Sequence, residues 1–146
     1  MEKKYILTEE TKEVGGRILH RIQAVRDFDA VQKGDLGGWV ESEENLSHDG
    51  NCWVFGDGEV FGNARIGVNA YISSPRSYFV QGPIGSRDDF LTYYLDKDKK
   101  IYAVTGCFSG TLEEFEKKVK ETHGSNKHAK QYLKAAEMAR VMLSGD

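Results

Sequence analysis

Branched aliphatic residues recur at every sixth position in the middle of the chain, at Val54, Val60, Ile66 and Ile72. A strand has a period of two and a helix a period of about 3.6, so neither element alone produces this spacing. The pattern predicts a coil of short, flat strands joined by tight corners. Each strand would then turn one aliphatic side chain inward.

Two further positions repeat with the same spacing. The residues four positions after an aliphatic are small, as a crowded corner requires: Gly58, Ala64 and Ala70. The residues just before these are Asp57, Asn63 and Asn69, types that tolerate left-handed backbone. Leu46 resembles an earlier, less regular rung, and Val40 is a candidate for another. The alternative is a run of ordinary hairpins in a glycine-rich sheet.

The segments on either side of this ladder follow other patterns. Residues 5–40 predict a β-rich segment, with a hairpin turn at Gly15-Gly16 and a turn cluster in "KGDLGGWV". Residues 76–142 predict three strands followed by two helices, the first capped by Thr111 and Glu114. For packing, the second helix offers Tyr132, Leu133, Ala136, Met138 and Val141.

We therefore predict an α+β protein in two parts. Residues 1–74 form the β-rich segment with its short hexapeptide coil, of the left-handed β-helix type, and residues 75–146 form a βββαα module. A short coil leaves apolar ends uncovered. The flanking segments cover them, or copies of the chain pack together; we favour self-association into a homo-oligomer.

Composition narrows the function classes. The chain has 146 residues and a net charge of −3, which argues against a generally basic nucleic-acid binder, although a local basic patch stays open. No apolar stretch is long enough to cross a bilayer, and the N-terminus lacks the apolar core of a signal peptide, so we expect a cytoplasmic protein. Cys52 and Cys107 are too far apart for a CxxC pair. We expect neither a metal nor a cofactor.

Two long stretches resemble a known group of proteins. The segment around "GDLGGWVESEENLS", followed by "VFGNARI", resembles phage and prophage proteins of the left-handed β-helix, hexapeptide-repeat type. The segments "GPIGSRDDF" and "GCFSGTLEEFEKKVKETHGSNKHAK" resemble a module found at the end of the same proteins. Three hexapeptides make one turn of such a helix, and the resemblance implies many more repeats than this chain contains.

Two enzymatic hypotheses have candidate residues. The best-known hexapeptide-repeat proteins are acyltransferases with a histidine base, and His48, beside Asp49, is the histidine of the ladder. The alternative for His48 is an exposed corner residue. Cys107 precedes a predicted helix, whose dipole favours a thiolate; the alternative is a buried cysteine at the end of a strand.

A binding site without turnover has more candidates. In "GPIGSRDDF", Gly85 and Ser86 favour a nest of backbone N–H groups for an anion, and Arg87 suits phosphate. A second donor cluster precedes and opens the last helix: Ser125, Asn126, Lys127 and His128. Arg76 is a candidate third corner of the site, and Phe108 is one of several aromatic faces for a base. The alternative is a turn with an Arg87–Asp88 or Arg87–Asp89 salt bridge and a capped helix.

These features favour a non-catalytic binding protein for a nucleotide-like small molecule, with its site between subunits. Phages carry such proteins to sequester the nucleotide second messengers of bacterial immune systems, and the resemblance implies a sponge of this kind. A structural module or a direct inhibitor of a host protein is the alternative, and acyl transfer ranks below both. We expect no membrane and no nucleic-acid polymer among the partners.

Overall fold

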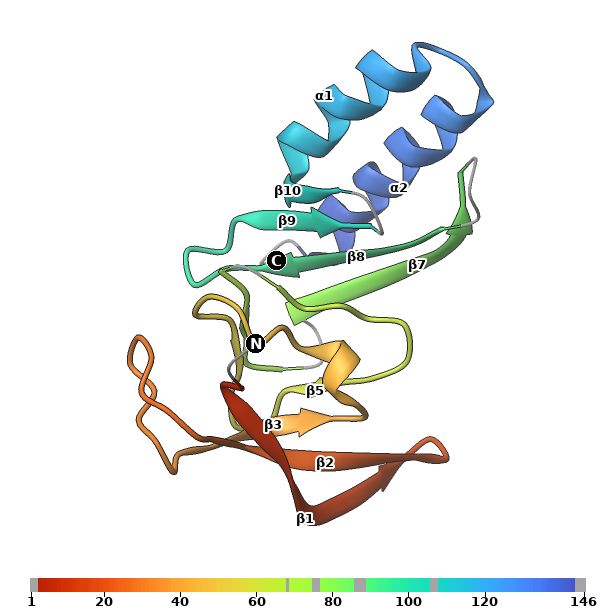
Figure 1. The fold of residues 1–146 in the computed structure, drawn as a ribbon. Helices are drawn as coiled ribbons and strands as arrows, with labels where there is room; N and C mark the ends of the chain where they lie inside the picture. Colours follow the sequence, from red (N-terminus) through yellow and green to blue (C-terminus); the bar gives the residue numbers. More distant parts are fainter. Residues whose placement is uncertain (1–2, 68, 75–76, 86–88, 106–107, 144–146) are drawn as a thin grey trace.

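The computed structural model describes residues 3–67, 69–74, 77–85, 89–105 and 108–143 of the chain. It is a mixed α+β structure in which strands dominate and the two helices come last. In Figure 1 the helices, the C-terminal sheet, the coil and the N-terminal sheet follow one another as layers. Among the described residues, no helix is both long and apolar enough to span a membrane.

The N-terminal sheet is built on a long hairpin. Strand β1 (Tyr5–Val14) pairs antiparallel with β2 (Arg17–Ala24), and β2 pairs antiparallel with β3 (Leu36–Val40). The turn glycines Gly15 and Gly16 have φ angles of 55° and 83°, the left-handed backbone that a tight hairpin turn requires. The predicted hairpin is confirmed.

The glycine pair Gly37-Gly38 lies inside β3, so the predicted turn cluster is wrong at this point. A Cβ atom on Gly37 would come 2.7 Å from both the Trp53 ring and the carbonyl oxygen of Val54. Glycine is needed here because the strand runs directly against the coil, and not because the chain turns.

The ladder residues stack in two layers joined by parallel pairing. Val40 in β3 pairs with Val60 in β5 (Glu59–Val60), twenty positions later. Val54 in β4 (Trp53–Val54) pairs with Ile72 in β6 (Tyr71–Ile72), eighteen positions later.

A third parallel bridge joins Leu46, just after the short 3-10 helix η1 (Glu43–Asn45), to Ile66. All six ladder aliphatics are buried, at 2% exposure or less. The predicted inward rungs are therefore confirmed, whereas the left-handed sense of the coil stays a prediction.

The corners of the coil differ in detail from the prediction. Left-handed backbone occurs at Gly56, at Gly62 and at Asn69, with φ angles of 37°, 65° and 67°. The prediction is right for Asn69 and wrong for Asp57 and Asn63, whose preceding glycines take the strained conformation instead. Glycine adopts it at lower cost because it has no Cβ atom.

The C-terminal module contains one strand more than predicted. Its antiparallel sheet has the order β10-β9-β8-β7. The strands are β7 (Tyr78–Ile84), β8 (Asp89–Leu95), β9 (Ile101–Val104) and the short β10 (Ser109–Thr111). The helices are α1 (Leu112–His123) and α2 (Lys127–Leu143).

The predicted capping of α1 is confirmed, whereas the residues predicted for packing on α2 are only partly buried. Thr111 and Glu114 form the reciprocal capping box, with N–H to side-chain oxygen distances of 2.8 and 3.2 Å. On α2, Tyr132 and Ala136 are buried, whereas Met138 and Val141 are 46% and 68% exposed. These last two residues, predicted as available for packing, lie largely on the exposed side of α2, whose buried face is narrow and rich in alanine.

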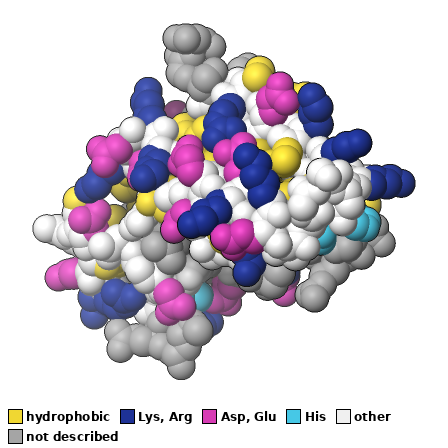
Figure 2. All heavy atoms as spheres, turned by 90° about the horizontal axis from the view of Figure 1, so that it is seen from above, with side chains coloured by type: hydrophobic (Ala, Val, Ile, Leu, Met, Phe, Trp, Pro, Cys, Tyr) yellow, Lys and Arg dark blue, Asp and Glu magenta, His cyan; other side chains and the backbone are white. Residues whose placement is uncertain are grey.

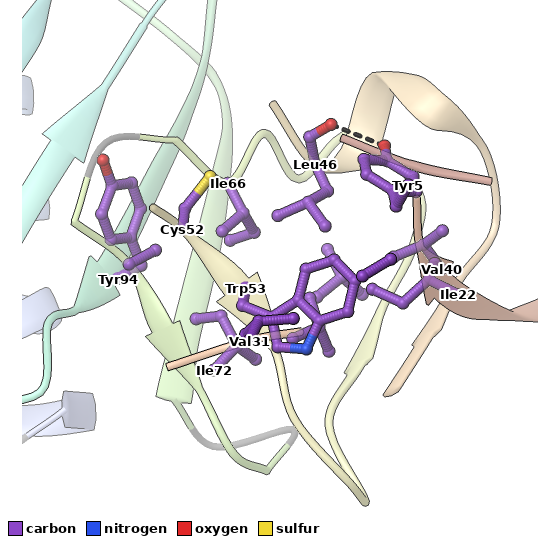
Figure 3. Packing of buried hydrophobic residues seen from close by; sticks show 14 of the residues in the cluster. Tyr5, Ile22, Val31, Val40, Leu46, Cys52, Trp53, Ile66, Ile72 and Tyr94 are labelled. Carbon is purple, nitrogen blue, oxygen red and sulfur yellow. Dashed lines mark hydrogen bonds between the residues drawn. The ribbon is translucent and has the colours of Figure 1, made fainter. Parts of the chain in front are cut away.

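The C-terminal sheet covers one end of the coil. Tyr94 of β8 belongs to the same apolar cluster as Leu46, Cys52 and Ile66, and Figure 3 shows its ring beside the last two. The neighbouring Tyr93 points to the other side, into a second cluster with the helices. The flanking segments of the chain therefore pack against the coil, and self-association into a homo-oligomer stays a prediction. The boundary between residues 74 and 75 stays a prediction, and the coil's core contains residues from both sides of it.

Candidate functional site

The turn after β7 is attached to helix α2 through Gly85. The backbone N–H of Gly85 donates to Oε1 of Gln131 at 3.1 Å. A Cβ atom on Gly85 would lie only 1.8 Å from Oη of Tyr132, and the φ angle of Gly85 is +81°. Glycine is thus required twice at this position, for its backbone conformation and for its close approach to the tyrosine.

Three rings gather beside this contact. His123, at the end of α1, stacks on Tyr132 with centroids 5.6 Å apart, and it lies 5.7 Å from the His128 ring. Nδ1 of His128 is buried and has no hydrogen-bond partner among the described residues. In Figure 1 the α1–α2 turn and the end of β7 lie on the same side of the molecule. We call the set Gly85, His123, His128, Gln131 and Tyr132 the junction.

The junction brings together part of the predicted site. Gly85 and His128 come from the two predicted donor clusters. Gly85 lies against Tyr132 of α2, and His128 lies on α2 four positions before Tyr132, beside the His123 ring. Asn126 acts as the helix cap, because its Oδ1 accepts the N–H of Ala129 at 3.0 Å. Ser125 and Lys127 are exposed beside it.

Basic side chains surround this end of the helices without dominating it. Figure 2, seen from the helix side, shows Lys and Arg mixed with Asp and Glu, and histidines at one edge of the face. Lys127 and Lys130 are exposed on the first turn of α2. Positive charge near a helix N-terminus, where backbone N–H groups point outward, favours an anion.

Other predicted site residues lie elsewhere or outside the described residues. Phe108 packs on Phe115 with centroids 5.6 Å apart, and Phe115 in turn packs on Tyr132, so Phe108 is one ring removed from the junction. Arg76, Ser86 and Arg87 lie outside the described residues, as does Cys107. Ser77, the neighbour of Arg76, precedes β7, and Gly85 follows it. They are eight residue steps apart, at most roughly 26 Å along the strand.

The described part of the predicted nest has little donor capacity left. Pro83 has no N–H group, and the N–H of Gly85 is already bonded to Gln131. The segment "GPI" belongs to β7, within the first of the three strands predicted for this module. Any anion at the junction would therefore be held by side chains and by the first turn of α2.

His48 is tied into the fold by both of its ring nitrogens. Nδ1 accepts the backbone N–H of Lys4 at 3.0 Å, so Nε2 carries the proton and donates to Glu43 at 2.9 Å. The ring stacks on Tyr5 at 4.2 Å, and its side chain is only 12% exposed. The alternative of an exposed corner residue is wrong. The imidazole has no lone pair left to accept a proton from a substrate.

The free thiol of Cys52 is also structural. Cys52 is fully buried, and its carbonyl oxygen accepts a hydrogen bond of 2.6 Å from the Lys4 ammonium, which is itself fully buried. Burial raises the pKa of the Cys52 thiol and lowers the pKa of the Lys4 amine. Within the described segments, no three His, Cys, Asp or Glu side chains are grouped as metal ligands.

Gln131 and Tyr132 are junction residues that sequence reasoning did not assign to a site. Tyr132 was predicted only as a packing residue, and Gln131 carried no signal. The spacing of His128 and Tyr132, four positions apart on one helix, places them on the same face and is the one clue that the sequence contains.

Comparison with known proteins gives a partial similarity. The chain is 36% identical over 80 residues to the uncharacterized acetyltransferase YdcK of Escherichia coli (strain K12). The match covers 49% of this chain and 24% of that relative, so the chain spans about a quarter of the relative's length. No family model matches the chain. This similarity supports the hexapeptide-repeat resemblance only distantly.

Proposed function

We propose that the protein is a non-catalytic binding protein that sequesters a phosphate-bearing, nucleotide-like small molecule at the junction. The observation that carries the proposal is the contact of Gly85 with Gln131 and Tyr132. It joins the end of β7 to the first turns of α2, and those are the two segments with anion-binding sequence features.

The chemistry of the junction suits such a ligand. The stacked rings of Tyr132 and His123 offer aromatic surface, and a base stacks on such a surface regardless of its identity. Nδ1 of His128 is a buried nitrogen that lacks a hydrogen-bond partner among the described residues. Lys127 and Lys130 add positive charge at the helix end.

The finer parts of the proposal follow the resemblance to phage proteins. The ligand would be a messenger of a bacterial immune system, a cyclic oligonucleotide or a cyclic ADP-ribose derivative. Copies of the chain would associate so that the site lies at their interface. The occupied nitrogens of His48 are consistent with binding in the absence of turnover.

Titration calorimetry with a panel of cyclic dinucleotides, cyclic trinucleotides and cyclic ADP-ribose tests the proposal. We expect one class to bind, and we expect His128→Ala and Arg87→Ala to weaken that binding at least tenfold. Lys118→Ala, which removes an exposed cation from α1, is the matched control and should leave binding unchanged. No binding across the panel, or equal loss in all three variants, would overturn the proposal.

Acetyl transfer is the second candidate, because the similarity to YdcK favours it. The hypothesis requires a base other than His48. Acetyl-CoA consumed above the blank rate, in the presence of amine and hydroxyl acceptors, would support this candidate and count against a purely binding role. We expect the rate of acetyl-CoA consumption with the protein to equal the rate without it.

A further inference from the structure

A hollow lies at the other end of β8 from the junction. Its volume is about 260 Å³. Three separate segments enclose it: the loop containing Asp29, the coil around Phe55 and Tyr71, and the β8–β9 turn at Asp96–Asp98. Ligand pockets commonly form where segments distant in sequence meet, and this volume suits a ligand smaller than a drug.

One wall of the hollow is aromatic. The rings of Phe55 and Tyr71 stack with centroids 4.3 Å apart, one from each layer of the coil. Tyr71 is 40% exposed although it is a large apolar side chain. An exposed aromatic face inside a hollow is a binding surface for an apolar group or for an organic cation.

The charge at the rim of the hollow favours an organic cation over an apolar group. Asp29, Asp96 and Asp98 line it, and among the described residues Lys97 is the one cation that lines it with them. Oδ1 of Asp96 accepts the N–H groups of Asp98 and Lys100, each at 2.9 Å. The Asp98 carboxylate has no hydrogen bond or ion pair within the described part of the chain. An excess of carboxylates repels phosphate and attracts a cation.

Lys97 does not neutralise the rim firmly. Its ammonium is 3.9 Å from Oδ2 of Asp29, and both side chains are about half exposed or more, at 66% and 48%. Exposed pairs of this kind contribute little free energy, so a ligand cation can displace the lysine.

Backbone strain is concentrated around the same hollow. Among the described residues other than glycine, left-handed φ angles occur at Asp29, Asn69 and Lys99. The first two line the hollow, and the third belongs to the adjoining β8–β9 turn. Strained residues outside glycine are found preferentially at ligand-binding loops, since the surrounding structure must hold them in place.

From the stacked rings and the carboxylate rim together, we infer that this hollow binds a small organic cation, an aliphatic amine or guanidine. The cation lies over the face of Tyr71, and the carboxylates of Asp98 and Asp29 hold its N–H groups. A guanidinium binds more tightly than an ammonium because it is planar and stacks on the ring. The inference does not depend on the proposed function.

Chemical-shift titration of the ¹⁵N-labelled protein tests this site with three probes: agmatine, putrescine and 1,4-butanediol. We expect saturable shifts around the hollow with both cations, agmatine binding more tightly, and no binding of the neutral diol. Equal affinity for putrescine and butanediol would overturn the inference.

Four variants separate the site from general electrostatic attraction. We expect Asp98→Asn and Tyr71→Leu each to weaken agmatine binding about three- to fivefold. Lys97→Gln should strengthen it, because it removes the competing cation. Asp57→Asn removes an exposed carboxylate from a coil corner outside the hollow and should change nothing. If Asp57→Asn weakens agmatine binding as much as Asp98→Asn does, the assignment of the binding site to this hollow is wrong.

Discussion

Gly38 and Gly58 lie so close together that a Cβ atom on Gly38 would come within 2.6 Å of the carbonyl oxygen of Gly58. The contact joins β3 to the coil corner before β5, so the N-terminal sheet and the coil meet here backbone to backbone.

A methyl group at this position must separate the two segments. We expect Gly38→Ala to lower the free energy of unfolding by about 2–3 kcal/mol, the upper range for an overpacked site. Gly67→Ala is the matched control. Its Cβ would meet only Oη of Tyr94 at 3.6 Å, an ordinary contact, and its φ angle is not left-handed. Urea denaturation of both variants checks the difference; a Gly38→Ala protein as stable as wild type would contradict the close approach.

The coil rungs should dominate stability. Leu46 is fully buried in the core cluster, so Leu46→Ala should cost about 2–5 kcal/mol through lost burial and the cavity left behind. Met138→Ala, on the exposed surface of α2, should stay within about 0.5 kcal/mol of wild type. Equal losses in the two variants would mean that the helix surface is covered in solution.

The junction contact can be measured as a coupling. Gly85→Ala should lower the free energy of unfolding by about 1–3 kcal/mol, because the new methyl group meets the Tyr132 ring. In Gly85→Ala/Tyr132→Leu, the loss should be smaller than the sum of the single losses, since the obstacle is gone. Gly124→Ala separates strain from crowding: its φ angle is also left-handed, at 62°, but a Cβ there meets nothing within 4 Å. Additive losses would contradict the contact.

Alkaline pH should destabilise the sheet that covers the coil. Burial raises the pKa of Tyr78 to about 12, from an ordinary value of 10.0. Between these values the unfolded chain has lost the phenol proton while the folded chain keeps it. The stabilising contribution is therefore complete below pH 10 and is lost as pH rises toward 12.

Guanidinium denaturation between pH 8 and pH 11 measures this effect. We expect the stability of the wild type to fall above pH 10. In Tyr78→Phe the fall should be shallower, although Tyr5, Tyr93 and Tyr94, whose pKa values burial also raises, still contribute. Identical slopes in the two proteins would show that Tyr78 ionises freely in the folded state.

Local features of the fold could be read from the sequence. The hairpin at Gly15-Gly16, the capping box of Thr111 and Glu114, and the inward aliphatics of the coil each depend on neighbours a few positions apart. Gly37 and Gly38 were misread because their requirement for glycine comes from Val54 and Gly58, residues distant in sequence. The local sequence contains the glycine pair but carries no sign of the distant backbone that approaches it.

The candidate site shows the same limit. Gly85 and His128 were both proposed from local features, and the structure brings their segments together through α2. The partners that join them, Gln131 and Tyr132, lie 46 and 47 positions after Gly85, and no local pattern connects residues so far apart. The hollow at Tyr71 was missed for the same reason, because its three walls come from separate segments.

The coil is closed from both directions by segments of its own polypeptide, with the ring of Tyr94 over one end and the β1–β2 hairpin along the other. The number of turns in the coil is therefore independent of the two segments that cover its ends. Eighteen extra residues with the same rung spacing, inserted at the corner after Val60, would add one turn and lengthen the coil by about 4.8 Å. The β1–β2 hairpin and the C-terminal sheet would keep their contacts with the ends of the coil, so the coil can be lengthened without changing either of them.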